Sequence, residues 1–343
     1  MSAPVRTRIL LPPAPAITAG MREAAWLSEE GEIERLPLKE AGRRLKQAEA
    51  CYLVHAGATA ARLGVERPAR AFDLLELFAF VRPARFCVPT PRGLADALGL
   101  PYPESLDDGP TGLLRAAQFL LEELARARDG DNQAPRVAGA MARGGWLWGP
   151  AVLSALGEGE EDVMLRAAAS GLDVWRRLKE WSEQAPPPPA GDRGIDPQDA
   201  RKRLAELLGP GAEERPGQAD YASAVSAAFA PKMSEGHPNM VLAEAGTGVG
   251  KTLGYIAPAS LWAEKNEAPV WISTYTRNLQ HQIDNELDRL YGDPEVKRAH
   301  VVVRKGRENY LCLLNLEEAA AGVQVNGADA VPLGLMARWA EAT

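Results

Sequence analysis

The chain has 343 residues, of which 46% are apolar and 25% charged, and this composition excludes a disordered or membrane-embedded protein. Its length is sufficient for two or three domains. The net charge of −7 excludes a protein that coats nucleic acid by bulk attraction alone, although a basic groove can lie on an acidic protein.

Neither a membrane anchor nor a disulfide framework is expected. No apolar run approaches the roughly 20 residues that a membrane span requires, and prolines interrupt the short apolar patch near the N-terminus. The three cysteines, Cys51, Cys87 and Cys312, are odd in number and far apart. We therefore expect a cytoplasmic protein in a reducing compartment, without a membrane partner.

Strand and helix patterns are mixed in the first half of the chain. Residues 22–36 are typical of a hairpin that turns at Glu30 and Gly31, and residues 51–56 of a buried strand. Helical spacing is found over residues 39–50, 72–81, 91–100, 112–128 and 161–184. These patterns predict a mixed α/β domain with extra helices over residues 1–183.

A proline-rich linker is expected over residues 184–199. The four prolines at 186–189 favour a stiff, extended segment, and no apolar periodicity continues through it. Asp196 followed by Pro197 is typical of the cap and first residue of a helix. The linker therefore separates the first domain from residues 200–343.

Helices and short apolar runs alternate regularly after the linker. The expected strands are residues 240–244, 269–274 and 300–304. The expected helices are residues 218–230, a helix that begins at Gly250, and residues 276–291. Because alternation of this kind implies helical crossovers between parallel strands, the predicted fold class is α/β, with helices on both faces of a parallel sheet.

A phosphate-binding loop is the strongest local signal. The pattern of glycine, four free positions and Gly-Lys-Ser/Thr is matched with alanine in the first place. The matching residues are Ala245, Gly246, Thr247, Gly248, Val249, Gly250, Lys251 and Thr252. Such a loop turns backbone N–H groups and a helix N-terminus toward phosphate, with the lysine at the phosphates and the threonine on Mg²⁺. A plain glycine-rich turn between strand and helix is the alternative.

Two flanking segments suggest what the nucleotide drives. Gln218 lies about thirty residues before Lys251, where a side-chain amide can recognise adenine; an exposed glutamine before a helix is the alternative. In residues 271–283, hydroxyl groups stand where a strand meets a helix, a setting that suits phosphodiester oxygens. An ordinary helix cap at Thr276 is the alternative there.

A third segment, VVVRKGRENYLC at residues 301–312, joins basic side chains to a cysteine. A lone cysteine is commonly a small buried hydrophobe. Here Arg304, Lys305 and Arg307 favour a thiolate and a nearby polyanion.

Together these segments resemble the XPD/DinG-like iron–sulfur helicases of superfamily 2 over about residues 200–320. The matching residues include Gln218, Thr274, Thr276, Leu279, Gln282, Lys305, Gly306, Arg307, Asn309, Tyr310 and Cys312. The resemblance implies a RecA-like motor with ATP and Mg²⁺ as cofactors, and 5′–3′ movement on single-stranded DNA or DNA forks. DNA contacts are then expected from Thr274, Thr276, Arg277, Gln282, Arg304, Lys305 and Arg307.

The match to this family has gaps. The resemblance makes Cys312 the first ligand of a 4Fe–4S cluster, yet no cysteine follows it, and neither is there an Asp-Glu-x-His box. We therefore expect an N-terminal fragment that binds nucleotide weakly, with no complete cluster and no unwinding of its own. Residues 332–342 should form a helix whose packing partner lies outside the chain. The alternatives are a phosphotransferase of another class and a non-catalytic product that binds nucleic acid or a protein partner.

The front domain resembles the later half of a 3′–5′ exonuclease-like fold. His55 and Asp73 lie near positions where an active nuclease would hold metal ions. Two-metal hydrolysis requires several converging carboxylates, and the early strand around residue 17 offers no Asp-x-Glu pair. We expect a degenerate, structural or protein-binding domain in preference to a nuclease. Trp146 and Trp148 are expected in its core.

Overall fold

The computed structural model describes residues 11–68, 70–127, 133–157, 172–178, 189–213, 215–232, 237–323 and 327–343. These residues form two compact units, each described by itself. The front unit is Met1–Glu180 with Leu311–Thr343, and the second unit is Trp181–Tyr310. Among the described helices, none is long and apolar enough to cross a lipid bilayer.

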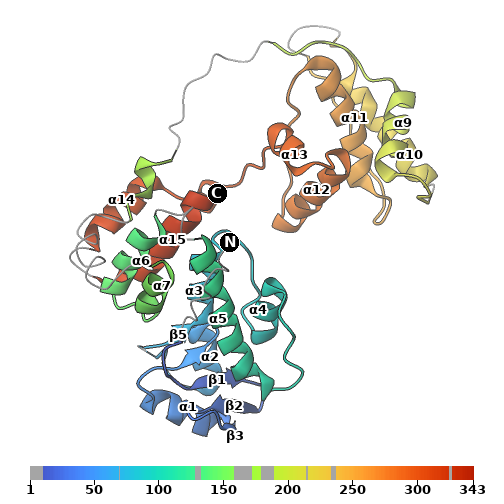
Figure 1. Ribbon diagram of the computed structural model, residues 1–343. Coiled ribbons are helices and arrows are strands. Elements are labelled where there is room, and N and C mark those ends of the chain that lie inside the picture. The colour runs from blue at the N-terminus through green and yellow to red at the C-terminus, as the bar shows by residue number, and fades with distance from the viewer. Residues whose placement is uncertain are drawn as a thin grey trace, which may run out of the picture. The chain divides into compact units, whose positions relative to one another are not determined.

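The front unit is built on a mixed five-stranded sheet in the order β3-β2-β1-β4-β5 (Figure 1). Its strands are β1 Ala16–Ala19, β2 Glu23–Leu27, β3 Ile33–Pro37, β4 Tyr52–Leu53 and β5 Phe72–Asp73. The first three pair antiparallel, with Ala16 opposite Leu27 and Leu27 opposite Ile33. β4 pairs parallel with both β1 and β5. The expected hairpin at Glu30 and Gly31 is therefore confirmed, as is the α/β class.

Helices cover both faces of this sheet. The helices of the first part of the unit are α1 Leu38–Gln47, α2 Ala56–Leu63, α3 Leu74–Val81, α4 Pro91–Leu98, α5 Asp108–Ala127, α6 Ala134–Arg143 and α7 Gly149–Ala155. Because side chains alternate along a strand, Ala16 and Tyr52 join one core with α3, α4 and α5. Ile17 and Leu53 point to the other face and join a core with α1 and α2. The result is a three-layer arrangement.

The last residues of the chain complete the front unit. Helices α14, Leu313–Gly322, and α15, Ala330–Ala342, share the large core with α3, α5 and α6. The expectation that residues 332–342 lack a partner within the chain was therefore wrong. An apolar stripe indicates that a helix has a partner but does not identify it.

The second unit consists of helices in the part of it that the structure describes. They are α9 Pro197–Leu208, α10 Pro216–Ser226, α11 Lys251–Asn266, α12 Arg277–Leu290 and α13 Pro294–His300. Asp196 caps α9 by accepting a hydrogen bond from the Gln198 amide at 2.8 Å, as the Asp-Pro pair predicts. Leu204, Ala222 and Ile256 belong to the small core where α9, α10 and α11 meet.

The parallel sheet expected in the second unit is not present among its described residues. Residues 240–244 and 269–274 form neither a helix nor a paired strand, and residue 300 ends a helix. Leu242 is 95% exposed and Trp271 is 78% exposed. Apolar runs predict burial, but a strand also needs neighbours to satisfy its backbone, and no described segment pairs with these. The prediction of three strands was therefore wrong for this structure.

The expected linker is partly fixed to the second unit. Of residues 184–199, the first five lie outside the described residues, and so does most of the helix expected over 161–184. The described part of that helix contains only a short 3-10 turn, Val174–Arg176. In the linker, the Arg193 amide donates to Oδ1 of Asn266 at 2.8 Å, at the end of α11. This half of the linker is therefore held in place.

Candidate nucleotide-binding site

The loop before α11 has a backbone that only glycine adopts easily. Gly248 has φ +82° and Gly250 has φ +87°, both in the left-handed region where a side chain is strained. Gly250 is the N-cap of α11, whose first residues are Lys251 and Thr252. Alternation of this kind curls N–H groups toward a common concavity at a helix N-terminus, which favours anions.

Open space lies beside the loop. A Cβ added at Gly246 or at Gly248 would meet no atom within 4 Å. The Lys251 ammonium folds back onto the loop and donates to the carbonyl oxygens of Ala245 at 2.7 Å and Gly246 at 2.8 Å. Since both acceptors are neutral, the positive charge remains available to an anion. Open space and an ammonium group are features that a phosphate-binding loop requires, and phosphate binding stays a prediction.

The Thr252 side chain is hydrogen-bonded to Tyr255 of the same helix, α11. Burial raises the pKa of Tyr255, and a hydrogen bond with the Thr252 side chain opposes that shift. Thr252 is only partly buried. A hydroxyl next to the phosphate-binding lysine is the expected Mg²⁺ ligand of such a loop.

Gln218 lies against the junction of loop and helix. It is only 4% exposed, and its Nε2 donates to the Gly250 carbonyl at 2.8 Å. A Cβ at Gly250 would lie 2.4 Å from that nitrogen, so glycine is required there both by its positive φ and by the lack of space. The alternative of an exposed glutamine was therefore wrong. Recognition of adenine by Gln218 stays a prediction.

Arg215 is a site residue that the sequence analysis missed. Its Nη1 donates to the Gly248 carbonyl at 3.0 Å, and its Nη2 donates to Glu213 at 2.9 Å. It precedes Gln218 by three residues, a spacing that places two side chains on one side of a helix start. The spacing of Arg215 and Gln218 is the sequence feature from which its place beside the loop could have been predicted.

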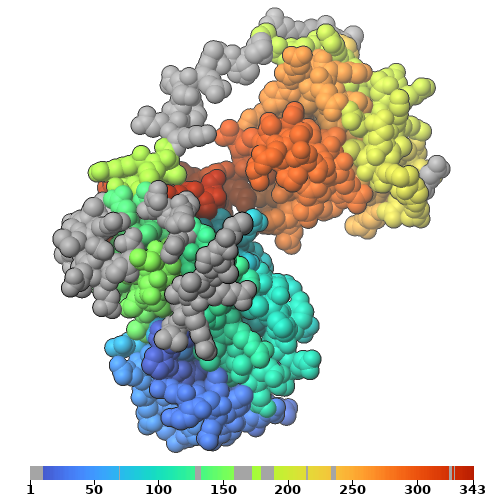
Figure 2. Space-filling model, viewed as in Figure 1, coloured from blue at the N-terminus to red at the C-terminus, as the bar shows by residue number. Residues whose placement is uncertain are grey.

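The residues expected to contact DNA fall into two groups, which the described hydrogen bonds do not join to the loop. Thr276 caps α12, accepting from the Leu279 amide at 3.2 Å, as the helix-cap alternative predicted. The Thr274 hydroxyl is buried without a hydrogen-bond partner among the described residues. Arg277 and Gln282 are exposed on α12. This helix is part of the orange surface in Figure 2.

The second group lies on residues 304–307. The Arg304 guanidinium lies 5.8 Å from the centre of the exposed Trp271 ring, which gives a cation–π contact. The Lys305 amide donates to the Tyr310 hydroxyl at 2.9 Å, while the Lys305 side chain is exposed. Arg307 begins a 3-10 turn and is also exposed. A cation beside an exposed aromatic ring suits a single strand.

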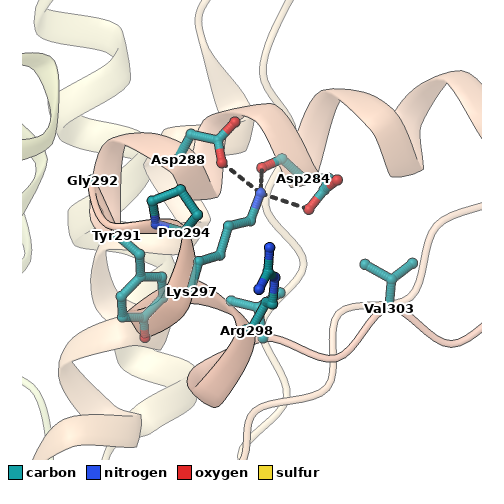
Figure 3. A pocket seen from close by; sticks show the side chains of 9 residues that line it. Asp284, Asp288, Tyr291, Gly292, Pro294, Lys297, Arg298 and Val303 are labelled. Carbon is teal, nitrogen blue, oxygen red and sulfur yellow. Dashed lines mark hydrogen bonds and ion pairs between the residues drawn. The ribbon is translucent and has the colours of Figure 1, made fainter. Parts of the chain in front are cut away.

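A cavity of about 510 Å³ lies between α12 and α13, away from the loop residues (Figure 3). Its central cation is Lys297, which donates to the backbone oxygen of Asp284 at 2.8 Å and to Asp288 at 2.6 Å. Hydrogen bonds with Asp284 and Asp288 raise the pKa of Lys297. Because two carboxylates already neutralise this lysine, the cavity is a poor phosphate site.

The described cysteines do not fit an iron–sulfur cluster, which requires four thiolates. Cys51 lies in the core of the front sheet, and burial raises its pKa. Cys87 donates to the Val88 carbonyl, and only Cys312 is exposed. Among described residues, no group of three or more His, Cys, Asp or Glu could hold a metal ion. The role of Cys312 as a cluster ligand stays a prediction for a longer protein.

His55 and Asp73 in the front unit hold the backbone. The Asp73 carboxylate accepts from the amides of His55 at 2.9 Å, Ala56 at 2.7 Å and Leu75 at 3.0 Å. It therefore ties the start of α2 to the start of α3. His55 Nδ1 accepts from the Ala58 amide at 3.2 Å, so it too caps α2.

Known proteins resemble part of this chain. A protein named "3'-5' exonuclease DinG" from Bacillus subtilis is 39% identical over 117 residues, 34% of this chain and 12% of that protein. "ATP-dependent helicase DinG" from Mycobacterium tuberculosis is 40% identical over 107 residues, which are 30% of this chain and 15% of that protein. "ATP-dependent DNA helicase YoaA" from Escherichia coli is 42% identical over 125 residues, which are 34% of this chain and 17% of that protein.

The matched regions are short relative to these proteins. The chain spans between 12% and 19% of the length of the curated relatives named DinG and YoaA. No family model matches the chain, and no solved structure matches it. Over about a third of its length, the chain is similar to curated proteins named DinG and YoaA.

Proposed function

We propose that this chain carries the ATP-binding part of a cytoplasmic, ATP-dependent DNA helicase. The observation that carries the proposal is the loop from Ala245 to Thr252, with two left-handed glycines, open space beside it and a lysine folded back onto it. In this proposal Lys251 contacts the phosphates, Thr252 binds Mg²⁺ and Gln218 recognises the base. ATP with Mg²⁺ would supply the free energy for movement along DNA.

The proposed DNA partner is a single strand or a fork, contacted by the exposed residues of the second unit. Exposed basic and aromatic side chains, such as Arg304 beside Trp271, support this assignment. In this proposal, movement from 5′ to 3′ and a 4Fe–4S cluster are properties of the whole helicase. For the 343 residues alone we propose nucleotide binding without unwinding.

We assign residues 1–183 to an exonuclease-like domain without a working nuclease site, joined by residues 184–199. The mixed sheet, with three antiparallel strands followed by two parallel pairings, supports this fold. The use of Asp73 as a cap for three amides supports a structural role for that carboxylate.

The experiment that tests the function is titration of the folded chain with a non-hydrolysable ATP analogue and Mg²⁺. We expect Lys251→Ala to weaken binding about tenfold or more, because a charge-assisted contact to phosphate is lost. Lys202→Ala, an exposed lysine on α9, is the matched control and should leave binding unchanged. If the folded wild-type chain did not bind the analogue, or if both variants bound it equally well, the assignment of the loop would be wrong.

A further inference from the structure

Residues 311–343 follow Cys312 and the basic segment, yet they fold with the front unit. Helix α15 lies beside α6 and α3 (Figure 1), and Leu333 and Ala337 are buried in the same core as Phe80 and Val137. The second unit is therefore inserted between two parts of one compact body, because the chain leaves that body near Glu180 and returns at Leu311.

Small residues let α15 approach its neighbours closely. A Cβ on Gly334 of α15 would lie 2.3 Å from Cγ of Met141 on α6. A Cβ on Gly144, just after α6, would lie 2.3 Å from Cβ of Ala330. Neither glycine has room for a side chain, so the surfaces of α6 and α15 are complementary at both ends of their contact.

Arg338 makes the polar contact between α15 and α3. The side chain is only 6% exposed, its Nε donates to the Phe80 carbonyl at 3.2 Å, and its guanidinium lies 4.9 Å from the centre of the Phe80 ring. Since α3 ends at Val81, the Phe80 carbonyl is one of the last in the helix and has no partner within it. A cation at the C-terminus of a helix is also favoured by the helix dipole.

A second ionic contact lies at the end of α15. Arg177 donates to Glu341 at 3.3 Å and also to Asp173 at 3.3 Å. Asp173 is itself buried. Arg177 and Glu341 are 164 residues apart in sequence, and Arg338 and Phe80 are 258 residues apart.

We propose that the front domain is a docking platform for the segment that follows Cys312, with the surface of α3 and α6 as the receptor and α15 as the occupant. The second unit is then anchored to one folded body at both of its ends. This gives the front domain a role that needs no nuclease chemistry. The proposal does not depend on nucleotide binding.

Amide hydrogen exchange of the full 343-residue chain, followed by mass spectrometry, tests the proposal. In the wild-type protein, the amides of α15 should be protected to the same degree as those of α3 and α6. Arg338→Ala should speed exchange in α15 and in the last turn of α3 about tenfold or more, because a buried charge-assisted contact is lost. Exchange in α11 and α12 should not change.

Two further variants complete the experiment. Gly334→Leu should have the same effect as Arg338→Ala through a clash with Met141. Met336→Ala, on the more exposed side of α15, is the matched control and should leave exchange unchanged. Unprotected α15 amides in the wild-type chain, or changes confined to α11 and α12 in the variants, would overturn the proposal. The wild-type measurement decides the matter even where a variant does not fold.

Discussion

In the front unit, helices cover both faces of a five-stranded sheet, and side chains as large as Trp148 and Tyr52 are completely buried. In the second unit, the buried core is a small group of side chains on α9, α10 and α11. Apolar residues such as Leu242 remain exposed there. Burial contributes about 25 cal/mol per Å², so the front unit should be the more stable of the two.

The contact of α15 and the loop before α11 differ in what surrounds their glycines. In the front unit, Gly334 and Gly144 permit close packing between helices. In the loop of the second unit, Gly246 and Gly248 border open space. Regions with few buried contacts open most readily, which is compatible with a site that must admit a ligand. The following predictions test this contrast, from the largest effect to the smallest.

The largest effect is expected at Trp148. Its ring lies 5.0 Å from Phe72 and 5.6 Å from Tyr52, and its Nε1 donates to the Asp73 carbonyl at 2.9 Å. Trp148→Ala should lower the free energy of unfolding of the front unit by about 3–5 kcal/mol through the cavity left behind. Urea unfolding followed by circular dichroism measures the change.

The matched control is a tryptophan of the other unit. Trp271 is 78% exposed, so Trp271→Ala should change the free energy of unfolding by less than about 1 kcal/mol. Equal losses from the two substitutions would contradict the contrast between the units.

The next effect depends on pH and on Glu76 in the front unit. Burial raises the pKa of Glu76 to about 7 from its ordinary 4.5, and the nearby charge of Asp73 adds to the shift. The Arg67 charge and the hydrogen bond from Trp146 Nε1, at 3.1 Å, oppose it. The folded state therefore binds more protons than the unfolded state between these two pH values.

The free energy of unfolding of the front unit should accordingly fall as pH rises from about 4.5 to about 7, by up to about 3 kcal/mol. Glu76→Gln should remove this fall, because the amide can still accept from Trp146 but does not ionise. Thermal unfolding at pH 4.5, 6 and 8 measures it. Glu122→Gln, an exposed position on α5, should keep the pH dependence; the same slope in both variants would refute the assignment to Glu76.

Local patterns predicted the hairpin of the front unit and the helices α1, α4 and α5, but not α2, α6 or α7, and residues 72–73, expected at the start of a helix, form β5. Thr90, for example, caps α4 and is followed by Pro91, and Gly31 lies in the expected hairpin turn. The contacts of α15 could not be predicted, because no local pattern tells that Arg338 reaches the Phe80 carbonyl, 258 residues away. Pairing between distant segments is a property of the folded chain.

The same distinction applies to the candidate site. The loop motif is contiguous, so its position and its left-handed glycines could be predicted from the sequence. The contact of Gln218 with Gly250 spans 32 residues, and its burial was not foreseen. The strands expected at 240–244 and 269–274 are not formed, and Leu242 and Trp271 within them are exposed. An apolar run predicts burial, but a strand forms only where a neighbouring strand pairs with it.

The smallest effect is expected where the linker meets α11 of the second unit. Asn266 is buried, accepts from the Arg193 amide at 2.8 Å, and donates to the carbonyls of Arg193 and Trp262, both at 3.0 Å. Asn266→Ala should lower the free energy of unfolding of the second unit by about 1–2 kcal/mol. The transition of the front unit, followed through Trp146 and Trp148, should stay in place.

Lys265→Ala is the matched control for this last substitution. Lys265 is the neighbour of Asn266 on α11 and pairs with Asp199 at 3.2 Å, in a position where both side chains are exposed. Exposed ion pairs contribute about 0–1 kcal/mol, so the loss should be smaller than that of Asn266→Ala. If Asn266→Ala instead destabilised the front unit, or cost no more than Lys265→Ala, the linker would not be fixed to α11 by this side chain.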